Sequence, residues 1–396
     1  MRAHDVIIVG GGPVGCFLGA SLAERGFDVL IIEEHAEIGN PVCCAGIVGA
    51  AGLNAIGIKR GDWVLNELRG AIFYPPSLEP FTINRGKVEA LVIDRAAFDR
   101  DLAMRAAEEG ASFLMRTKCV DVKFDECVRV KAIGASGKQE IRSRLCIGAD
   151  GPASVVARRA GLLKSTQAIN AAQLEVFSAE ASDIAELYFG RDFAPGFFAW
   201  IVKAGDVARV GLGTTEGAAL QKLFRFIKSH PIASRKINGR KVIHFTSGPI
   251  PQPMTRKIYS DRVLLVGDAA GHIKPLTGGG LFVGLSCARL AADVAVRALE
   301  NEPTAEALRE YEKEFKKRFG NELSVTLRAQ RAFQRMSDAE LDKIFKIFAR
   351  EDIRELIMER GDFDFHGDLV KALLRRGITL LPSLGLGWLL KSFKTF

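Results

Sequence analysis

The sequence predicts an α/β fold in which an open α/β domain is interrupted by an antiparallel β-sheet domain and followed by a helical C-terminal region. The chain opens on a strand–turn–helix–strand pattern over residues 5–33. Residues 166–250 contain many short strands with Gly and Pro breaks, and residues 281–350 have helical spacing. Strands that alternate with helices favour a parallel sheet, whereas runs of short strands favour an antiparallel one.

The elements of the first domain follow from local residue patterns. DVIIV at 5–9 predicts a buried strand, residues 13–26 predict a helix that ends at Gly26, and residues 28–33 predict a second strand. The remaining elements before residue 151 are a helix over 94–110, which stops at Gly110, and strands within 111–125, 128–134 and 140–150.

The domain boundaries follow from where these patterns change. RVLLVGD at 262–268 returns to the continuous apolar type that is typical of parallel strands. The sequence therefore predicts three units. They are a Rossmann-like domain over 1–165 and 255–300, an antiparallel-sheet substrate domain over 166–254, and a helical C-terminal region over 301–396 with an apolar tail at 377–396.

A glycine-rich turn joins the first strand to the first helix. Gly10, Gly12 and Gly15 form a GxGxxG pattern, in which the glycines permit a tight turn, close approach of a pyrophosphate and packing of the helix on the strand. The helix N-terminus then offers N–H donors to the phosphates. Glu33 ends the second strand, where a carboxylate accepts hydrogen bonds from ribose hydroxyls. This loop predicts a dinucleotide site but does not distinguish FAD from NAD.

Cysteine spacing and charge limit the other classes. The seven cysteines include no CxxC pair, so no zinc knuckle and no cysteine-ligated iron–sulfur cluster is expected, and the sequence predicts no metal site. The net charge of +8 favours an anionic partner such as a nucleotide cofactor, a phospholipid surface or an acidic redox protein. Zinc-finger and RNP patterns are missing, so nucleic acid is not expected to bind.

A second glycine-rich region identifies the dinucleotide. GADGPASVVARRAG at 148–161 and RVLLVGDAAGHIKPLTGGG at 262–280 resemble the para-hydroxybenzoate-hydroxylase-like FAD enzymes. This resemblance implies that FAD is held by separate parts of the chain, with Asp268 on a ribityl or ribose hydroxyl. A turn cap is the plainer role of Asp268.

Further motifs resemble the archaeal geranylgeranyl reductases, which reduce isoprenoid double bonds in membrane lipids. The motifs are PVCCAG at 41–46, DRAAFDRDL at 94–102, FAWIV at 198–202 and KPLTGGG at 274–280. The similarity covers about residues 4–350. This chain departs from the family pattern at Cys43, where an arginine is common, at Lys274, where an aspartate is common, and after Trp200, where an aromatic residue and a proline are missing.

The resemblance also implies which other residues contact FAD. Arg95 matches the family's FAD-contacting arginine, and Cys119 and Val120 lie on the strand that offers backbone atoms to the adenine. The remaining implied contacts are the cysteine loop, Cys44, Ala45 and Gly46, and the start of the helix after the second glycine loop, Gly279, Gly280 and Leu281. A helix N-terminus there stabilises negative charge on the reduced flavin.

Three side chains are candidates for the reaction itself. Cys44 is a candidate for shaping the site and relaying a proton, because neighbouring groups can tune the pKa of a thiol. The plainer interpretation is that Cys44 is a small buried side chain with no role in the reaction. Phe198 and Trp200 share one face of a strand and are expected either to line an apolar tunnel or to form ordinary sheet core. A fourth residue, His272, has an imidazole that can act as an acid or base. We interpret it at least as readily as a surface loop residue.

These observations predict an FAD-dependent reductase that saturates C=C bonds of geranylgeranyl chains. The expected reductant is NAD(P)H or reduced ferredoxin, and the expected partners are a prenylated lipid and ferredoxin. Three alternatives stay open: an FAD monooxygenase of the same superfamily, an electron-transfer flavoprotein that acts on quinone, and a non-enzymatic prenyl-lipid carrier.

The expected location is the cytoplasm, with peripheral association to an anionic membrane. Free thiols favour a reducing compartment, and no apolar run reaches the ~18 residues that a spanning helix needs. The tail 377–396 contains Trp388 between apolar residues and ends near Lys391 and Lys394, which is typical of interfacial segments.

Overall fold

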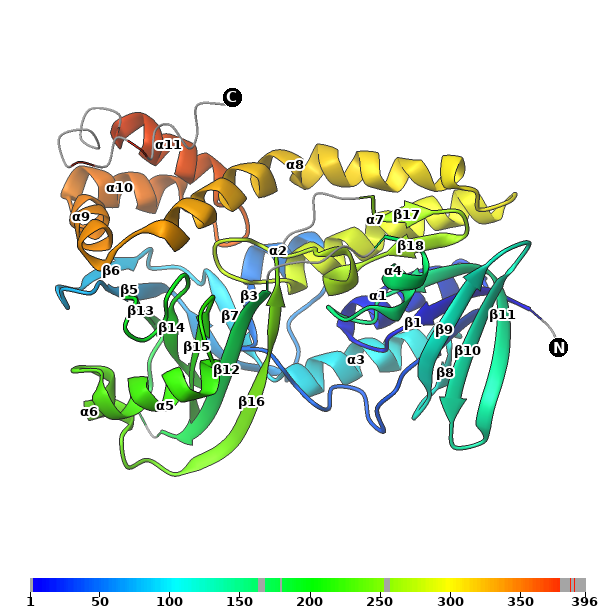
Figure 1. Ribbon diagram of the computed structural model, residues 1–396, viewed down its shortest axis with the longest axis horizontal. Coiled ribbons are helices and arrows are strands. Elements are labelled where there is room, and N and C mark those ends of the chain that lie inside the picture. The colour runs from blue at the N-terminus through cyan, green and yellow to red at the C-terminus, as the bar shows by residue number, and fades with distance from the viewer. Residues whose placement is uncertain are drawn as a thin grey trace.

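The computed structural model describes residues 3–162, 168–178, 180–252, 257–377, 385 and 388. Two lobes lie side by side along the long axis, and one long helix, α8 (Ala305–Arg335), runs along both (Figure 1). The α/β class and the helical C-terminal region predicted from the sequence are confirmed.

The first lobe is centred on an eight-stranded sheet with the strand order β17-β18-β11-β1-β2-β8, to which β10 and β9 are joined through β11. The β1, β2, β8, β11 and β18 strands of its centre pair in parallel. The strands are β1 His4–Val9, β2 Val29–Ile32, β8 Ser112–Leu114, β9 Lys118–Phe124, β10 Val128–Gly134, β11 Gly137–Gly148, β17 Tyr259–Ser260 and β18 Val263–Leu265.

Helices cover this sheet because its central strands are apolar on both faces. In β1 the four residues from Val6 to Val9 are buried, and in β2 all four are buried. Such strands need helices on each side. The helices of this lobe are α1 Pro13–Ala23, α3 Arg95–Glu108, α4 Val155–Arg159 and α7 Leu281–Leu299.

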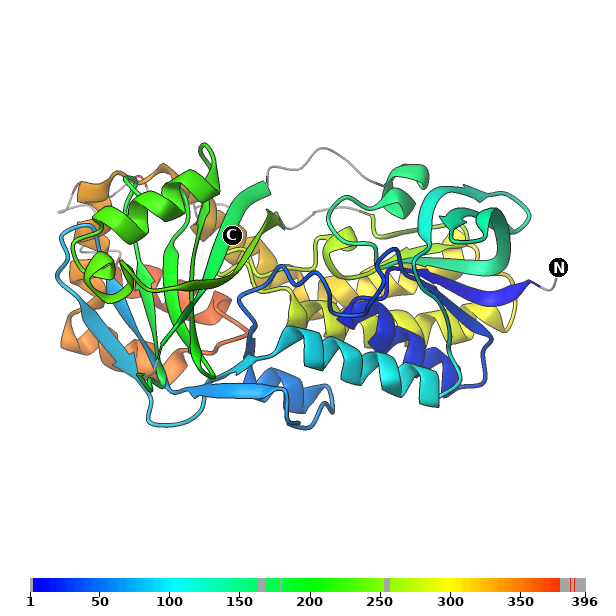
Figure 2. The same cartoon turned by 90° about the horizontal axis from the view of Figure 1, so that it is seen from below.

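The second lobe contains a seven-stranded sheet with the order β16-β12-β15-β14-β13-β5-β6. Its strands are β5 Gly70–Tyr74, β6 Phe81–Asn84, β12 Ala168–Phe177, β13 Ile184–Tyr188, β14 Ala199–Ala204, β15 Val207–Thr214 and β16 Val242–Pro251. Two helices, α5 (Ala219–Ser229) and α6 (Ala233–Ile237), pack on one face (Figure 2).

This sheet differs from the predicted antiparallel sheet of 166–254 in two respects. Strands β5 and β6 come from residues 70–84, which the sequence places in the first domain. In addition, β13 pairs with β5 in parallel, so the sheet is mixed. The strand pattern of residues 70–84 does not record which sheet the strands join, because pairing over more than 100 residues depends on tertiary contacts. The domain boundaries themselves stay a prediction.

A small sheet and the C-terminal helices complete the molecule. The three-stranded sheet β3-β7-β4 lies between the lobes with one short helix; its elements are β3 Ile47–Gly49, α2 Ala50–Ala55, β4 Val64–Leu68 and β7 Ala90–Ile93. The C-terminal helices after α8 lie over the second lobe (Figure 1): α9 Asp338–Phe348, α10 Glu351–Arg360 and α11 Gly367–Gly377. The tail beyond α11, apart from residues 385 and 388, is outside the described residues.

Candidate functional site

The first glycine loop lies between the carboxyl end of β1 and the N-terminus of α1, as the sequence predicts. A Cβ atom at Gly15 would lie 2.1 Å from the Gly10 carbonyl oxygen, so helix and loop can pack this closely only around glycine. At Gly12, by contrast, a Cβ atom would meet nothing within 4 Å. Gly12 therefore borders open space in front of the helix N-terminus, where free N–H groups favour an anion.

Two carboxylates flank this space. Glu33, which follows β2, accepts hydrogen bonds from the Gly11 amide (2.7 Å) and the His35 amide (2.8 Å). Asp268 lies in a short 3-10 turn, η1 Gly267–Ala270, and within the described residues its carboxylate receives no hydrogen bond. Burial raises the pKa of Asp268, and the positive charge of Arg95 acts in the opposite direction.

These features fit a dinucleotide such as FAD. The helix N-terminus at Gly12 suits a pyrophosphate, Glu33 suits a ribose hydroxyl, and Asp268 has a half-buried carboxylate that receives no hydrogen bond from the described part of the chain. Gly280, the N-cap of α7, would place a Cβ atom only 3.2 Å from Asp268 Oδ1. The second glycine loop and Asp268 are therefore neighbours.

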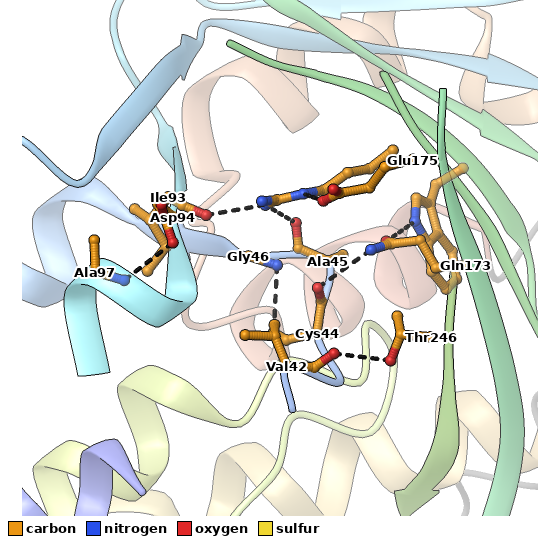
Figure 3. Close-up of polar contacts among 12 residues, drawn as sticks. Val42, Cys44, Ala45, Gly46, Ile93, Asp94, Ala97, Gln173, Glu175 and Thr246 are labelled. Carbon is orange, nitrogen blue, oxygen red and sulfur yellow. Dashed lines mark hydrogen bonds and ion pairs between the residues drawn. The ribbon is translucent and has the colours of Figure 1, made fainter. Parts of the chain in front are cut away.

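The cysteine loop at 41–46 is held by the second sheet (Figure 3). Three of its backbone carbonyls accept hydrogen bonds from side chains of three different strands. The bonds are Thr246 Oγ1 to Val42 (2.8 Å), Gln173 Nε2 to Cys44 (3.3 Å) and Arg209 Nη1 to Ala45 (2.9 Å). Residues from β16, β12 and β15 thus fix a loop that follows β2 of the other lobe.

Arg209 is the strongest of these anchors. Its guanidinium also donates to the Ile93 carbonyl (2.9 Å) and to Glu175 (2.8 Å), and only 7% of the residue is exposed. Gly46 has a φ of +70°, and a Cβ atom there would lie 2.3 Å from Arg209 Nη1. The sequence analysis missed Arg209 and Gln173. A sequence signal for these residues was present. Gln173, Glu175 and Arg209 are polar residues within largely apolar strands, a pattern that indicates buried polar contacts.

The two cysteines of the loop differ in their surroundings. Cys43 is exposed, with its sulfur 3.2 Å from Thr246 Oγ1. Cys44 is half-buried, and its sulfur accepts a hydrogen bond from the Gly46 amide (3.3 Å). The Trp200 indole donates to Gln173 Oε1 (3.0 Å), so Gln173 connects Trp200 to the Cys44 backbone.

Arg95 lies where the cysteine loop meets Asp268. Its guanidinium donates to both oxygens of Asp99, at 3.0 and 2.9 Å. Burial acts to lower the pKa of Arg95, but Asp99 and the nearby Cys44 thiol outweigh burial and raise it. Arg95 is therefore a permanent cation beside these groups, with 14% of its side chain exposed.

Cys119 and Val120 lie on β9, away from the cysteine loop. Cys119 is buried, and burial together with the Asp150 carboxylate raises the pKa of its thiol to about 12. Val120 is 37% exposed. The influence of Asp150 places Cys119 near the Asp150-Gly151 turn, which follows β11.

A cavity of about 650 Å³ joins these parts of the site. It is within the range of about 300–1,000 Å³ that small-molecule sites occupy. Most of its lining is apolar and aromatic. The predicted site residues that line this cavity are Cys44, Ala45, Phe198, Trp200, Asp268 and Gly279. The other predicted site residues lie outside its lining: Gly10, Gly12, Gly15, Glu33, Gly46, Arg95, Cys119, Val120, Gly280 and Leu281.

The aromatic wall of the cavity comes from β14 and the residues before it. Phe198 and Trp200 both line the cavity, with their ring centroids 6.1 Å apart in an edge-to-face arrangement. Phe197 stacks on Phe198 at 4.2 Å. Phe198 and Trp200 therefore lie on the same face of the strand, as the alternation of the sequence predicts.

A buried ion pair closes the cavity on the C-terminal side. Lys274 Nζ donates to Asp364 Oδ1 (3.0 Å) and to the Phe363 carbonyl (2.7 Å), and each side chain of the pair is 5% exposed. Burial lowers the pKa of Lys274, and Asp364 opposes that shift. The sequence marks Lys274 as unusual for its loop but does not indicate its partner 90 residues later.

His272 is not a surface residue, so that interpretation is wrong. The residue is fully buried, and its ring packs against Phe315 (4.8 Å between centroids) and Tyr311 (6.3 Å). Neither ring nitrogen has a hydrogen-bond partner in the described part of the chain. Burial lowers the pKa of His272 to about 3, so the ring is neutral near pH ~7. The η1–α7 connection folds inward because the helices α7 and α8 cover it.

Comparison with known proteins places this site in a family. A family model described as an FAD binding domain matches residues 3–42 and 79–322. A Methanopyrus kandleri protein named digeranylgeranylglycerophospholipid reductase 2 is 35% identical over 396 residues, covering 96% of this chain and 97% of that protein. A Methanocaldococcus jannaschii protein named digeranylgeranylglycerophospholipid reductase is 34% identical over 403 residues, covering 99% and 97%.

One solved structure matches nearly the whole chain. It is a geranylgeranyl bacteriochlorophyll reductase-like protein from Thermoplasma acidophilum, with a TM-score of 0.84 and 28% identity. The match covers 97% of this chain and 100% of that protein. Both lobes and their relative arrangement are therefore shared.

Proposed function

The chain belongs to the FAD-binding family that includes the digeranylgeranylglycerophospholipid reductases, and we propose that it saturates C=C bonds of geranylgeranyl chains in membrane lipid biosynthesis. The observation that carries this proposal is the apolar cavity. It extends from Asp268 and Gly279 on the FAD side to the aromatic wall of Phe198 and Trp200. A prenyl chain has no polar group to recognise, so an apolar and aromatic lining is what its binding needs.

The bound cofactor supplies the electrons. When bound, FAD would supply the two electrons, as a hydride, that the saturation of a C=C bond requires; the second hydrogen must reach the other alkene carbon as a proton, so that two C–H bonds replace one π bond. We propose NAD(P)H or reduced ferredoxin as the external reductant that restores the flavin.

The protein residues hold and shape the reaction site. Glu33, Asp268 and the glycine loops are proposed to bind FAD, together with Arg95, Cys119, Val120, Gly280 and Leu281. The Cys44 loop faces the cavity and is fixed by Gln173 and Arg209. We propose the Cys44 thiol as the relay for the proton. Restraint of the loop from the second sheet would hold that thiol at a constant distance from the alkene.

One experiment separates this function from its alternatives. The purified protein is loaded with FAD, reduced anaerobically with dithionite, and incubated with a geranylgeranyl glycerophospholipid. Mass spectrometry should show two hydrogen atoms gained for each bond reduced, with reoxidation of the flavin.

The other outcomes identify the alternatives. Rapid NADPH oxidation in air with oxygen inserted into the substrate would indicate a monooxygenase. Electron delivery to quinone with an unchanged lipid would indicate an electron-transfer flavoprotein, and a lipid that stays bound with no flavin turnover would indicate a carrier. Each of the three outcomes would overturn the reductase assignment.

The location of the substrate implies contact with a membrane. We propose that the protein associates peripherally with an anionic membrane from the cytoplasmic side. Among the described residues, no helix is long and apolar enough to cross a bilayer.

A further inference from the structure

The basic charge of the chain is concentrated in one segment. Residues 217–260 contain nine lysine and arginine residues and no aspartate or glutamate. The other residues of the chain contain 46 basic and 47 acidic side chains, so they are close to neutral. The net charge of +8 therefore belongs to this segment, whose described residues include α5, α6 and β16.

Several of these cations have no carboxylate partner in the described part of the chain. Arg225, Lys236 and Arg240 form ion pairs with Asp192, Glu186 and Glu180. No ion pair is found for Lys222, Lys228, Arg235 and Lys241. Lys228, Arg235 and Lys241 are exposed, so their charges are available to a partner.

The same segment exposes large apolar side chains. Among the most exposed large hydrophobic residues of the described chain are Phe224 (45%), Val242 (53%), Ile243 (58%) and Phe245 (42%). Single exposed hydrophobic residues are common, but a group within one basic segment is a sign of an interaction surface.

Strand pairing places two of these residues beside α5. Val242 lies opposite Val176, and Phe245 lies opposite Leu174, on the neighbouring strand β12. Val176 and Leu174 pack in the core beneath α5. Because paired residues point to the same face of a sheet, Val242 and Phe245 continue this apolar face on the uncovered edge strand.

On α5, Phe224 lies on the solvent-facing side of the helix, on a different flank from Arg225. Arg225 lies on the other flank, where it contacts Asp192 and the Phe193 ring in the connection before β14. Lys228 is one turn from Phe224 and therefore on the same face of the helix. Figure 2 shows α5, α6 and the first half of β16 on the near face of the molecule.

The second half of β16 leads from this surface to the cavity. Residues 246–250 of the strand line the cavity, directly after the exposed residues 242–245. Thr246 of this stretch also holds the cysteine loop. The exposed surface and the candidate active site thus lie at opposite ends of β16.

We propose that this α5–β16 surface, formed by Phe224, Lys228, Arg235, Lys241, Val242, Ile243 and Phe245, docks the protein on an anionic lipid bilayer. Cations bind the lipid phosphates while the apolar tips enter the head-group region. A prenyl chain then enters the cavity along the second half of β16. The docking stands without the proposed reductase function, whereas delivery of the prenyl chain rests on it.

Vesicle co-sedimentation of the FAD-loaded protein tests the docking. Two test variants are Lys228→Glu/Lys241→Glu and Phe224→Ser/Ile243→Ser. Two matched controls on the first lobe are Lys123→Glu/Lys138→Glu, which makes the same change in net charge, and Met104→Ser/Ile133→Ser, which removes equally exposed apolar residues. Circular dichroism and flavin content confirm that each variant folds.

The wild-type protein should bind phosphatidylcholine vesicles that contain phosphatidylglycerol, and binding should weaken as salt is added. Each test variant should lower the partition coefficient by roughly tenfold or more, and each control by much less. Three results would overturn the proposal: no binding of the wild-type protein, wild-type binding by both test variants, or equal losses in the controls. Binding of an acidic protein in place of vesicles would likewise reject the bilayer.

An activity measurement separates this proposal from the proposed function. The test variants should reduce a detergent-solubilised geranylgeranyl lipid at the wild-type rate and the same lipid in vesicles at least roughly tenfold more slowly. If the wild-type protein binds vesicles but reduces neither form, the reductase function fails and the docking stands. If the test variants bind vesicles weakly but reduce both forms at the wild-type rate, delivery along β16 is wrong.

Discussion

Among single side chains, Cys44 is the one whose substitution has the most specific expected effect on the rate of alkene reduction. The Cys44→Ser substitution keeps the volume, and a serine hydroxyl also accepts the Gly46 amide hydrogen bond. Its pKa is far higher, so proton transfer should slow. We expect unchanged FAD content and dithionite reduction, and alkene reduction slower by roughly 10- to 100-fold under anaerobic single turnover.

Cys43→Ser is the matched control for this prediction, because Cys43 is the exposed member of the pair. It should leave the rate unchanged. A wild-type rate in Cys44→Ser would reject the proton relay, and a slow rate in Cys43→Ser alone would assign the relay to the neighbour.

The buried His272 predicts how stability depends on pH. Its folded-state pKa of about 3 is below the usual value, so the imidazole is neutral in the folded protein but takes up a proton in the unfolded chain as the pH falls. Stability is therefore complete above about pH 6.5 and is lost toward lower pH, by about 2 kcal/mol between about pH 7 and about pH 5 for this residue.

The His272→Leu variant should remove this part of the pH dependence. Urea denaturation at the two pH values would show a smaller loss of unfolding free energy in the variant. An identical loss in both proteins would mean that His272 takes up a proton equally well in the folded state.

Between elements, the Lys274–Asp364 pair joins the second glycine loop to the connection between α10 and α11. Lys274→Met leaves the Asp364 carboxylate buried without its cation, and we expect the free energy of unfolding to fall by about 3–5 kcal/mol. The double variant Lys274→Met/Asp364→Asn removes both charges and should lose less than the single variant.

Urea denaturation of the two single variants and the double variant forms a complete cycle. If the losses add, the two side chains do not interact across the elements, and the C-terminal helices are not held to the loop by this pair.

For the molecule as a whole, FAD binding should raise the free energy of unfolding, because the residues proposed to bind FAD come from four separate parts of the chain. A ligand that binds only the folded state adds about 2.7 kcal/mol at a concentration of about 100 times Kd. Gly12→Val tests this coupling. A Cβ atom at Gly12 meets no protein atom within 4 Å, so the variant should fold with wild-type stability without FAD.

Thermal unfolding with and without added FAD would measure the effect. The wild-type protein should show a raised Tm with FAD, and Gly12→Val should show none, since its side chain occupies the space of the pyrophosphate. Gly15→Ala is the contrasting control, because its Cβ atom would lie 2.1 Å from the Gly10 carbonyl and should destabilise the protein without FAD. FAD stabilisation of Gly12→Val equal to that of wild type would place the phosphates elsewhere.

The sequence by itself determined the local features of this protein. The first strand, turn and helix, the helix over 95–108, and the helix after the second glycine loop lie where residue spacing places them. Such features depend on short-range periodicity and on glycine positions, which are present in the sequence. The α/β class follows from the same patterns, whereas the FAD family follows from the resemblance of residues 148–161 and 262–280 to known FAD enzymes.

Only the tertiary structure decided which distant residues meet. The Cys44 loop is held by Gln173 and Arg209, and Lys274 pairs with Asp364. The strands of residues 70–84 join the second sheet, and His272 is buried beneath α8. These contacts depend on strand register and on how helices cover a loop. Neither leaves a periodic pattern in the sequence, because each is fixed by packing between segments that lie far apart in the chain.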